Sequence, residues 1–369
     1  MVDLDELKRF PDVDGPGLSA SDAADRLILD EAGPLLATGA AGTVSVIDDA
    51  YGALTLGSGA KDVRVHQDLL TGERALTANA ERLGADGITH LPLSPAVVDG
   101  SRIVLMRLPR SLDRLAEVAA QIAAHADPDV VVVAGGRIKH MTPQMNRVLR
   151  EVFDRVDVSH ARQKSRVLFA RAPRREAAAV ALAGWPRTEQ HDGLTVAAHG
   201  GVFAGTRIDV GTRLLVSVLY DAVPAAATAV DLACGTGVVA AVLASARPDL
   251  RVTATDRSAA AVASARATAD ANGVADRVVV HRSDGLESFP DRSQDLIALN
   301  PPFHSDAALS TGIAHHLFTD AARALASGGE LWCVWNSHLR YRGSLERIVG
   351  PTRQIARNAK FTVTASRRV

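Results

Sequence analysis

Hydrophobic residues gather in short runs that polar stretches separate along most of the chain. Apolar runs predict buried strands in the N-terminal half at residues 44–47, 63–67, 103–106 and 130–133. Between the last two, Leu112 to Ala126 carries apolar residues on one helical stripe with charged residues opposite, which is typical of a helix packed on a sheet. Residues 35–173 are therefore expected to form one α/β unit.

The same alternation returns in the C-terminal half. Strands are predicted at residues 229–232, 251–255, 277–281, 295–299 and 330–334, with alanine-rich helices between several of them. A basic stretch with two prolines interrupts the strand pattern between the halves. We expect an N-terminal domain over 1–173, a linker over 174–186 and a second doubly wound domain over 187–369. Two α/β units of similar length suggest a duplication.

Composition places the chain among ordinary globular proteins. It has 369 residues, which favours two domains over one, and its net charge of −1 indicates no partner by itself. Cys234 and Cys333 form no metal or disulfide pattern, which is typical of a reducing compartment. Because neither a leader peptide nor a long apolar run is seen, we expect a cytoplasmic protein, with no membrane or metal partner, and a monomer by default.

The strongest local signal is the sequence Val230-Asp-Leu-Ala-Cys-Gly-Thr-Gly237, which joins a predicted strand to a predicted helix. Gly235 and Gly237 let backbone approach a ligand, and the helix N-terminus supplies free N–H donors. Asp256 ends the next strand, where a carboxylate is placed to bind both hydroxyls of a ribose. The turn lacks the third glycine of a dinucleotide site, so the pattern favours another nucleoside cofactor.

Two further motifs follow later strands. Asp284 comes after the third strand, where it could bind an adenine amino group. Asn300-Pro301-Pro302-Phe303 comes after the fourth, and its two prolines stiffen the turn. The Asn300 side-chain oxygen and the Pro301 carbonyl can accept hydrogen bonds from one planar NH2 group, and Phe303 can stack on a base. This arrangement favours transfer of a group to an amino nitrogen by positioning and electrostatics.

These motifs, in this order, resemble a class I methyltransferase that uses S-adenosylmethionine. Three further segments are similar to the RsmC/RlmG family: Gly201 to Gly211, Asn336 to Tyr341, and Asn358 to Phe361. The resemblance covers nearly the whole chain. It implies two tandem Rossmann-like methyltransferase domains, the N-terminal one degenerate, and transfer of a methyl group to the N2 amine of a guanine in ribosomal RNA, 16S or 23S.

The resemblance also assigns roles to residues of this chain. Ribosomal RNA or a ribosomal subunit is the expected partner, and S-adenosylmethionine is the expected cofactor. The expected catalytic residues are Asn300, Pro301, Pro302 and Phe303. The expected cofactor-binding residues are Asp231, Ala233, Gly235, Gly237, Asp256, Asp284 and Asn300. The expected substrate-binding residues are Asp209, Arg207, His304 and Arg340.

Two positions depart from the family pattern. Ala233 stands where relatives usually have glycine, which the turn tolerates if the φ angle is negative. Arg207 is displaced by two places from the usual arginine, where this chain has Gly205. The departures bear on cofactor binding and on substrate contacts respectively.

The first α/β unit lacks both motifs. It has Asp48-Asp-Ala-Tyr-Gly-Ala in place of the glycine turn and Arg107-Leu-Pro-Arg110 in place of the Asn-Pro-Pro-Phe motif. We expect it to position RNA or support its partner domain, with phosphate contacts from Arg107, Arg110, Arg137, Lys139 and Arg147. Eight Lys or Arg residues and one acid in 340–369 add a basic C-terminal segment, and residues 161–175 add another.

Other functions stay open at this point. Methylation of DNA adenine or of a protein glutamine uses related turns, although Phe303 and His304 argue against both. A ribosome-assembly factor that has lost catalysis is the alternative from another class, and Ala233 keeps it open.

Overall fold

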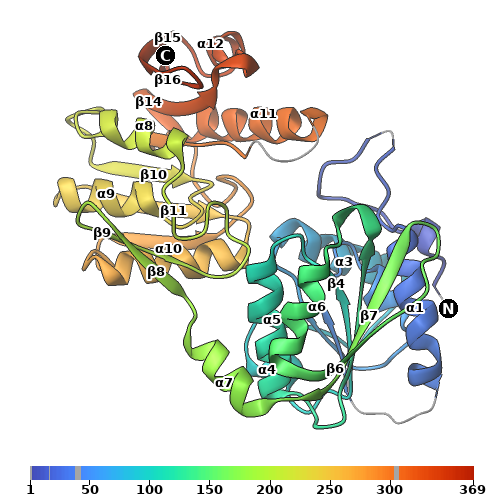
Figure 1. Cartoon of the computed structure of the whole chain (residues 1–369). Helices are drawn as coiled ribbons and strands as arrows, with labels where there is room; N and C mark the ends of the chain where they lie inside the picture. The colour runs from blue at the N-terminus through green and yellow to red at the C-terminus, as the bar shows by residue number, and fades with distance from the viewer. Residues whose placement is uncertain (1, 16, 38–42, 303–306) are drawn as a thin grey trace. The chain divides into compact units, whose positions relative to one another are not determined.

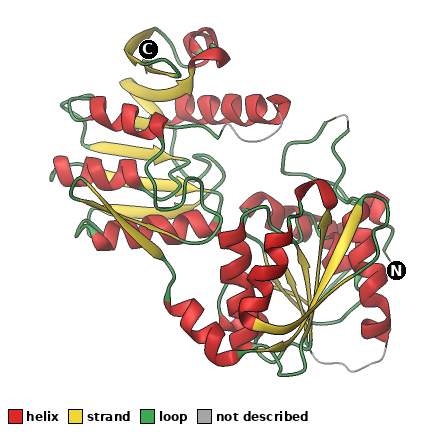
Figure 2. Ribbon diagram, in the orientation of Figure 1, coloured by secondary structure: helices red, strands yellow, loops and turns green. Residues whose placement is uncertain are grey.

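The computed structural model of the chain describes residues 2–15, 17–37, 43–302 and 307–369. These residues fall into two compact units, Met1–Trp185 and Pro186–Val369 (Figure 1). In each unit helices cover both faces of one seven-stranded sheet (Figure 2). The predicted fold class, two tandem Rossmann-like α/β domains, is confirmed.

The first sheet has the strand order β3-β2-β1-β4-β5-β7-β6. β1 to β5 are parallel, and β7 and β6 close one edge as antiparallel strands. The strands are β1 Val44–Ile47, β2 Val63–His66, β3 Ile88–His90, β4 Ile103–Arg107, β5 Val131–Arg137, β6 Phe153–Val158 and β7 Ser165–Pro173. The helices are α1 Ala23–Ala37, α2 Ala53–Gly57, α3 Leu70–Leu83, α4 Pro95–Val98, α5 Leu112–His125, α6 Pro143–Val152 and α7 Arg175–Ala183, with short 3-10 turns at η1 Leu4–Glu6 and η2 Ile138–His140.

The second sheet repeats this order as β12-β11-β10-β13-β14-β16-β15. Its strands are β10 Thr228–Leu232, β11 Arg251–Asp256, β12 Val278–Arg282, β13 Gln294–Leu299, β14 Leu325–Asn336, β15 Thr352–Arg357 and β16 Phe361–Arg367. Its helices are α8 Val210–Leu219, α9 Val238–Ala246, α10 Ala259–Ala271, α11 Ala307–Ala324 and α12 Arg342–Ile348, with the 3-10 turn η3 Ser337–Leu339. A separate hairpin, β8 Arg187–His191 and β9 Leu194–Ala198, packs on α10.

Aliphatic side chains fill both faces of each sheet, as the low aromatic content leads one to expect. In the second unit, one core lies between the sheet and α8, α9 and α10, and the other lies under α11 and α12. Phe318, Tyr341 and Trp335 supply the aromatic part of the second core.

The predicted linker over 174–186 is largely helical. α7 packs against α5 of the first unit, and its Ala178 is fully buried. The basic stretch before it is also ordered structure, because residues 165–173 form β7, where Arg171 pairs with Asp157 of β6 at 2.9 Å. Side chains on such a strand alternate between the core and solvent, so its arginines read as a charged segment in the sequence.

The strand registers show which residues of the two units are equivalent. Ile47 pairs with Met106, and Leu232 pairs with Leu299 in the same way, so Arg107 occupies the position of Asn300. The turns after the first strands also match, and they share left-handed backbone at three positions. The equivalent φ angles are +56° and +57° at Asp48 and Ala233, +65° and +55° at Ala50 and Gly235, and +101° and +74° at Gly52 and Gly237.

Gly237 is required by packing as well as by backbone conformation. A Cβ atom here would lie 2.8 Å from the Cβ of Ala265 in α10, whereas one on Gly235 would meet nothing within 4 Å. Both glycines have left-handed φ angles. Gly237→Ala and Gly235→Ala should therefore share a backbone cost of about 1–2 kcal/mol, and Gly237→Ala should lose roughly 1–3 kcal/mol more through overpacking. Urea unfolding followed by tryptophan fluorescence measures the difference, and equal losses would contradict the close packing of α9 on α10.

Candidate active site

The glycine turn sits between β10 and α9, at the carboxyl edge of the second sheet. The Gly235 N–H donates to Asp256 Oδ2 at 3.0 Å, and Gly237 forms the left-handed N-cap of α9. The space beside Gly235 is open where its Cβ would point. The turn thus presents bare backbone and the first N–H groups of α9, as a site for a bound ligand requires.

Ala233 does not have the negative φ angle under which the turn would tolerate alanine in place of glycine. Its φ angle is +57°, in the left-handed region, where a side chain costs about 1–2 kcal/mol. Alanine is tolerated without this cost only at a negative φ angle, so the turn carries the cost in this chain. Asp48 holds the same conformation in the first unit, so the turn imposes it whatever the side chain.

Asp231 lies beneath the turn rather than on its open side. Its side chain is buried, and Oδ2 accepts a hydrogen bond from the Ala240 N–H in the first turn of α9 at 3.0 Å. Burial, with a smaller contribution from the charge of Asp256, raises the pKa of Asp231 to about 8. The protonated carboxyl therefore ties β10 to α9 at neutral pH.

Asp256 is fixed at the end of β11. Its Oδ2 accepts from the Gly235 N–H, and its Oδ1 accepts from the Ser258 N–H at 2.9 Å. Asp284 follows β12, where its Oδ2 lies 3.9 Å from His316 Nε2 of α11. Because β11 and β12 run parallel, both carboxylates lie at the same edge as the turn.

Asn300 follows β13 at that edge, and its amide is anchored from one side. Nδ2 donates to Thr212 Oγ1 at 2.9 Å and to Asp209 Oδ2 at 3.2 Å, both in the first turn of α8. Its Oδ1 is buried and has no hydrogen-bond partner among the described residues. Burying a carbonyl oxygen without a hydrogen-bond donor costs free energy. This oxygen is therefore a candidate to accept a hydrogen bond from an N–H group of a ligand. Pro301, which follows, is buried as well.

Thr212 is a site residue that the sequence reading missed. Asp209 is the N-cap of α8, and its Oδ2 accepts from the Thr212 N–H at 3.0 Å, so the Asp-x-x-Thr spacing of a helix start was the available signal. Gly211 lets this turn approach Phe361, because a Cβ on it would lie 3.1 Å from the Phe361 ring. Phe361 pairs in turn with Asn336. Three segments that carry the family resemblance are thus brought together.

The remaining predicted residues divide into two groups. Phe303 and His304 lie outside the described residues. Arg207 is exposed in the loop before α8, and Arg340 is exposed at the end of η3. The structure therefore groups the predicted cofactor residues and Asn300 at one edge, and leaves these two arginines on the surface.

The described residues contain neither a cluster of His, Cys, Asp and Glu side chains that could hold a metal ion nor a helix long and apolar enough to cross a membrane.

Comparison with known proteins identifies the family. Residues 3–174 match the RLMG N-terminal domain, and residues 193–365 match the Methyltransferase small domain. The ribosomal RNA large subunit methyltransferase G of Streptomyces coelicolor is 35% identical, with 97% of this chain and 96% of that protein covered. The protein of the same name from Pseudomonas aeruginosa is also 35% identical over the same shares. The chain belongs to the ribosomal RNA large subunit methyltransferase G family.

A solved structure shares the fold of this methyltransferase G family member along its whole length. The T. thermophilus 16S rRNA N2 guanine methyltransferase RsmC, in complex with AdoMet and guanosine, superimposes with a TM-score of 0.74. It is 20% identical, with 97% of each chain covered.

In the first unit of this methyltransferase G family member, side chains of the unit itself fill the equivalent site. Arg107, at the position of Asn300, binds both oxygens of Asp25 at 2.7 Å and reaches Asp22 at 3.2 Å. Asp48, at the position of Ala233, is held by Arg114 of α5 at 3.0 Å. The expectation that Arg107 contacts phosphate is wrong, because two carboxylates already bind it.

The raised pKa of Asp231 has a consequence for stability. Its ordinary value is 3.8, so between about pH 4 and pH 8 the unfolded chain ionises this group while the folded chain keeps it protonated, and folding becomes less favourable as the pH rises. Asp231→Asn cannot ionise and can still accept from Ala240. The free energy of unfolding of the wild type should fall by about a few kcal/mol relative to that of the variant as the pH rises from 5 to 8. Parallel urea-unfolding profiles at these two pH values would contradict the assignment.

Proposed function

We propose that this chain transfers a methyl group from S-adenosylmethionine to the N2 amine of a guanine in the RNA of the large ribosomal subunit. The observation that carries the proposal is the buried Asn300 Oδ1, which lacks a donor among the described residues while its amide nitrogen is anchored. The relatives are named for the large subunit, and this name favours 23S over 16S rRNA. We also propose a cytoplasmic location, where ribosomal subunits are found.

The residues at the carboxyl edge fit the cofactor. The open side of Gly235 admits its methionine end, Asp256 at the end of β11 is placed beside the turn for the ribose hydroxyls, and Asp284 stands one strand further along for the adenine. S-adenosylmethionine supplies an electrophilic methyl group, so the protein needs no metal for this step.

Asn300 orients the accepting nitrogen. In a planar arylamine the nitrogen lone pair is delocalised into the ring, which makes the amine a poor nucleophile. An acceptor at Asn300 Oδ1 and a second at the Pro301 carbonyl hold the two N–H bonds and favour a pyramidal nitrogen. A rigid dipole placed this way lowers the barrier without reorganising during the reaction. The guanine must leave its stack to reach these acceptors.

We further propose that the first unit, over 1–173, positions the RNA or supports the catalytic unit, which begins after the segment 174–186. The filled site around Arg107 and Asp48 supports a role other than cofactor binding. A monomer suffices for this chemistry, because every residue named for it lies in one unit of one chain.

Asn300→Ala tests the proposed function. The variant should lose at least about 100-fold in kcat, since both the acceptor and its orientation disappear, while its affinity for S-adenosylmethionine should fall by much less, because Gly235, Asp256 and Asp284 remain. The measurements are mass-spectrometric mapping of N2-methylguanosine in large-subunit rRNA from a deletion strain and calorimetric titration of the cofactor. Asn146→Ala, on α6 of the first unit, is the matched control. Full activity of Asn300→Ala would exclude its role, and a wild type that binds no cofactor would favour an inactive assembly factor.

Thr212 is a positioning residue, and its hydroxyl should be needed for kcat. Thr212→Val removes one of two acceptors that hold the Asn300 amide, so the freed side chain should lower kcat by roughly 10- to 100-fold. The KM for S-adenosylmethionine should not change, and Thr212→Ser should restore the rate. A loss that serine does not rescue, or a matching fall in melting temperature, would indicate a structural role only.

A further inference from the structure

A pocket of about 290 Å³ lies on the C-terminal strands of the second unit. Its lining residues are Trp335, Ser337, Arg340, Arg342, Gln354, Arg357, Thr362 and Thr364. The strand register explains the grouping, because Thr362 pairs with Trp335 on one side and with Arg357 on the other. Buried Trp335, Thr362 and Thr364 contribute from the sheet, while the arginines are exposed around them.

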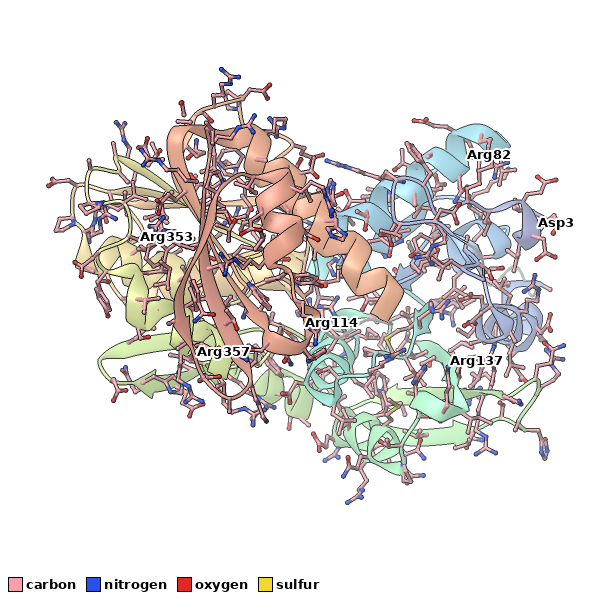
Figure 3. All side chains as sticks on the ribbon, turned by 90° about the horizontal axis from the view of Figure 1, so that it is seen from above. Asp3, Arg82, Arg114, Arg137, Arg353 and Arg357 are labelled. Atoms are coloured by element: carbon pink, nitrogen blue, oxygen red, sulfur yellow. The ribbon has the colours of Figure 1, made fainter. Side chains whose placement is uncertain are left out.

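The pocket is lined by hydrogen-bond donors and by no carboxylate. Arg342 is bound by Glu346 at 3.0 Å, but the side chains of Arg340 and Arg357 have no partner among the described residues. By contrast Glu330 neutralises the neighbouring Arg353 with two hydrogen bonds, at 2.7 and 2.8 Å. Figure 3 labels Arg353 and Arg357 on the same hairpin. Uncompensated positive charge therefore remains at the pocket.

Arg340, which lines the pocket, also has a strained backbone conformation. Its φ angle is +52°, which costs a residue with a side chain about 1–2 kcal/mol. Strain of this kind is retained where the surroundings or a function require it. Here it directs the chain from η3 into α12 with Arg340 on the rim of the pocket.

The pocket stands at the same edge of the sheet as Asn300. β13 and β14 are parallel, so Asn300 and Asn336 follow at their carboxyl ends, and Phe361 beside Asn336 packs near Gly211 at the Asn300 anchor. The strand residues of the pocket lie on β14, β16 and β15, which are one to three strands from β13. At a strand spacing of about 4.8 Å, this is roughly 5–15 Å from Asn300 across the sheet.

We propose that this pocket binds a phosphate group of the RNA backbone near the target guanine. The inference rests on the proposed function and names a contact for its substrate. Guanidinium groups match phosphate oxygens in geometry as well as charge. The amide of Gln354 adds a donor, and so does one of the hydroxyls of Ser337 and Thr362, which share a hydrogen bond of 2.8 Å. Donors that converge on one hollow suit a compact anion with several acceptors, whereas an acidic peptide spreads its carboxylates along a surface.

The test is the double variant Arg340→Gln/Arg357→Gln in the full chain. Its control is Arg347→Gln/Arg368→Gln, which removes the same charge from the same segment outside the pocket. The probe is deproteinised large-subunit rRNA with S-adenosylhomocysteine, so binding is measured without methyl transfer. The pocket variant should bind roughly tenfold more weakly than the control, and its log affinity should depend on log salt with a slope shallower by about 1.4, from two contacts at about 0.7 each.

Equal affinity and equal salt slope in the two double variants would overturn the proposal. Polyglutamate and unlabelled rRNA are each tested as competitors for the bound rRNA. If polyglutamate competes as strongly per charge as rRNA does, the pocket belongs to an acidic protein partner and the proposal is overturned. The proposed function fails separately, if the wild type binds rRNA through the pocket but methylates none. If the wild type methylates rRNA but the pocket variant binds rRNA as well as the control does, only the role of the pocket is refuted.

Discussion

The anchoring of the Asn300 amide nitrogen to the first turn of α8 is the constraint on which the candidate site depends. An amide can direct its oxygen outward only if its nitrogen has acceptors behind it, and Asp209 and Thr212 provide them. The cap geometry of α8 fixes these two acceptors, and Gly211 lets that turn lie close to Phe361. The C-terminal strands therefore help to position a group that follows β13, although they contribute none of the cofactor residues.

The central part of the fold was readable from the sequence, and the edges were not. Strands such as β4 and β13 are buried on both faces, so they appear as continuous apolar runs. β7 and β15 carry two arginines each, and the sequence around them was interpreted as a basic segment. The short β3 has no fully buried residue and gave no signal.

The candidate site divides in the same way. Gly235, Asp256 and Asn300 follow predicted strands, so their common edge could be expected from parallel topology. The sign of φ at Ala233 is set by the turn as a whole, and no single residue type reveals it. Thr212 contacts a residue far away in the chain, and the arginine pocket depends on the cross-strand register of β14, β15 and β16. Contacts of this kind exist only once the sheet has formed.

The ion pairs in the first unit make its filled site hard to convert into one like that of the second unit. Arg107→Asn alone would leave the fully buried Asp25 without its positively charged partner, and an unpaired buried charge costs about 3–5 kcal/mol. A substitution of Arg114 would likewise leave Asp48 without its ion-pair partner. Each single substitution toward the residues of the second unit therefore passes through a less stable protein, so the first unit can change its surface more easily than it can acquire a site like that of the second unit.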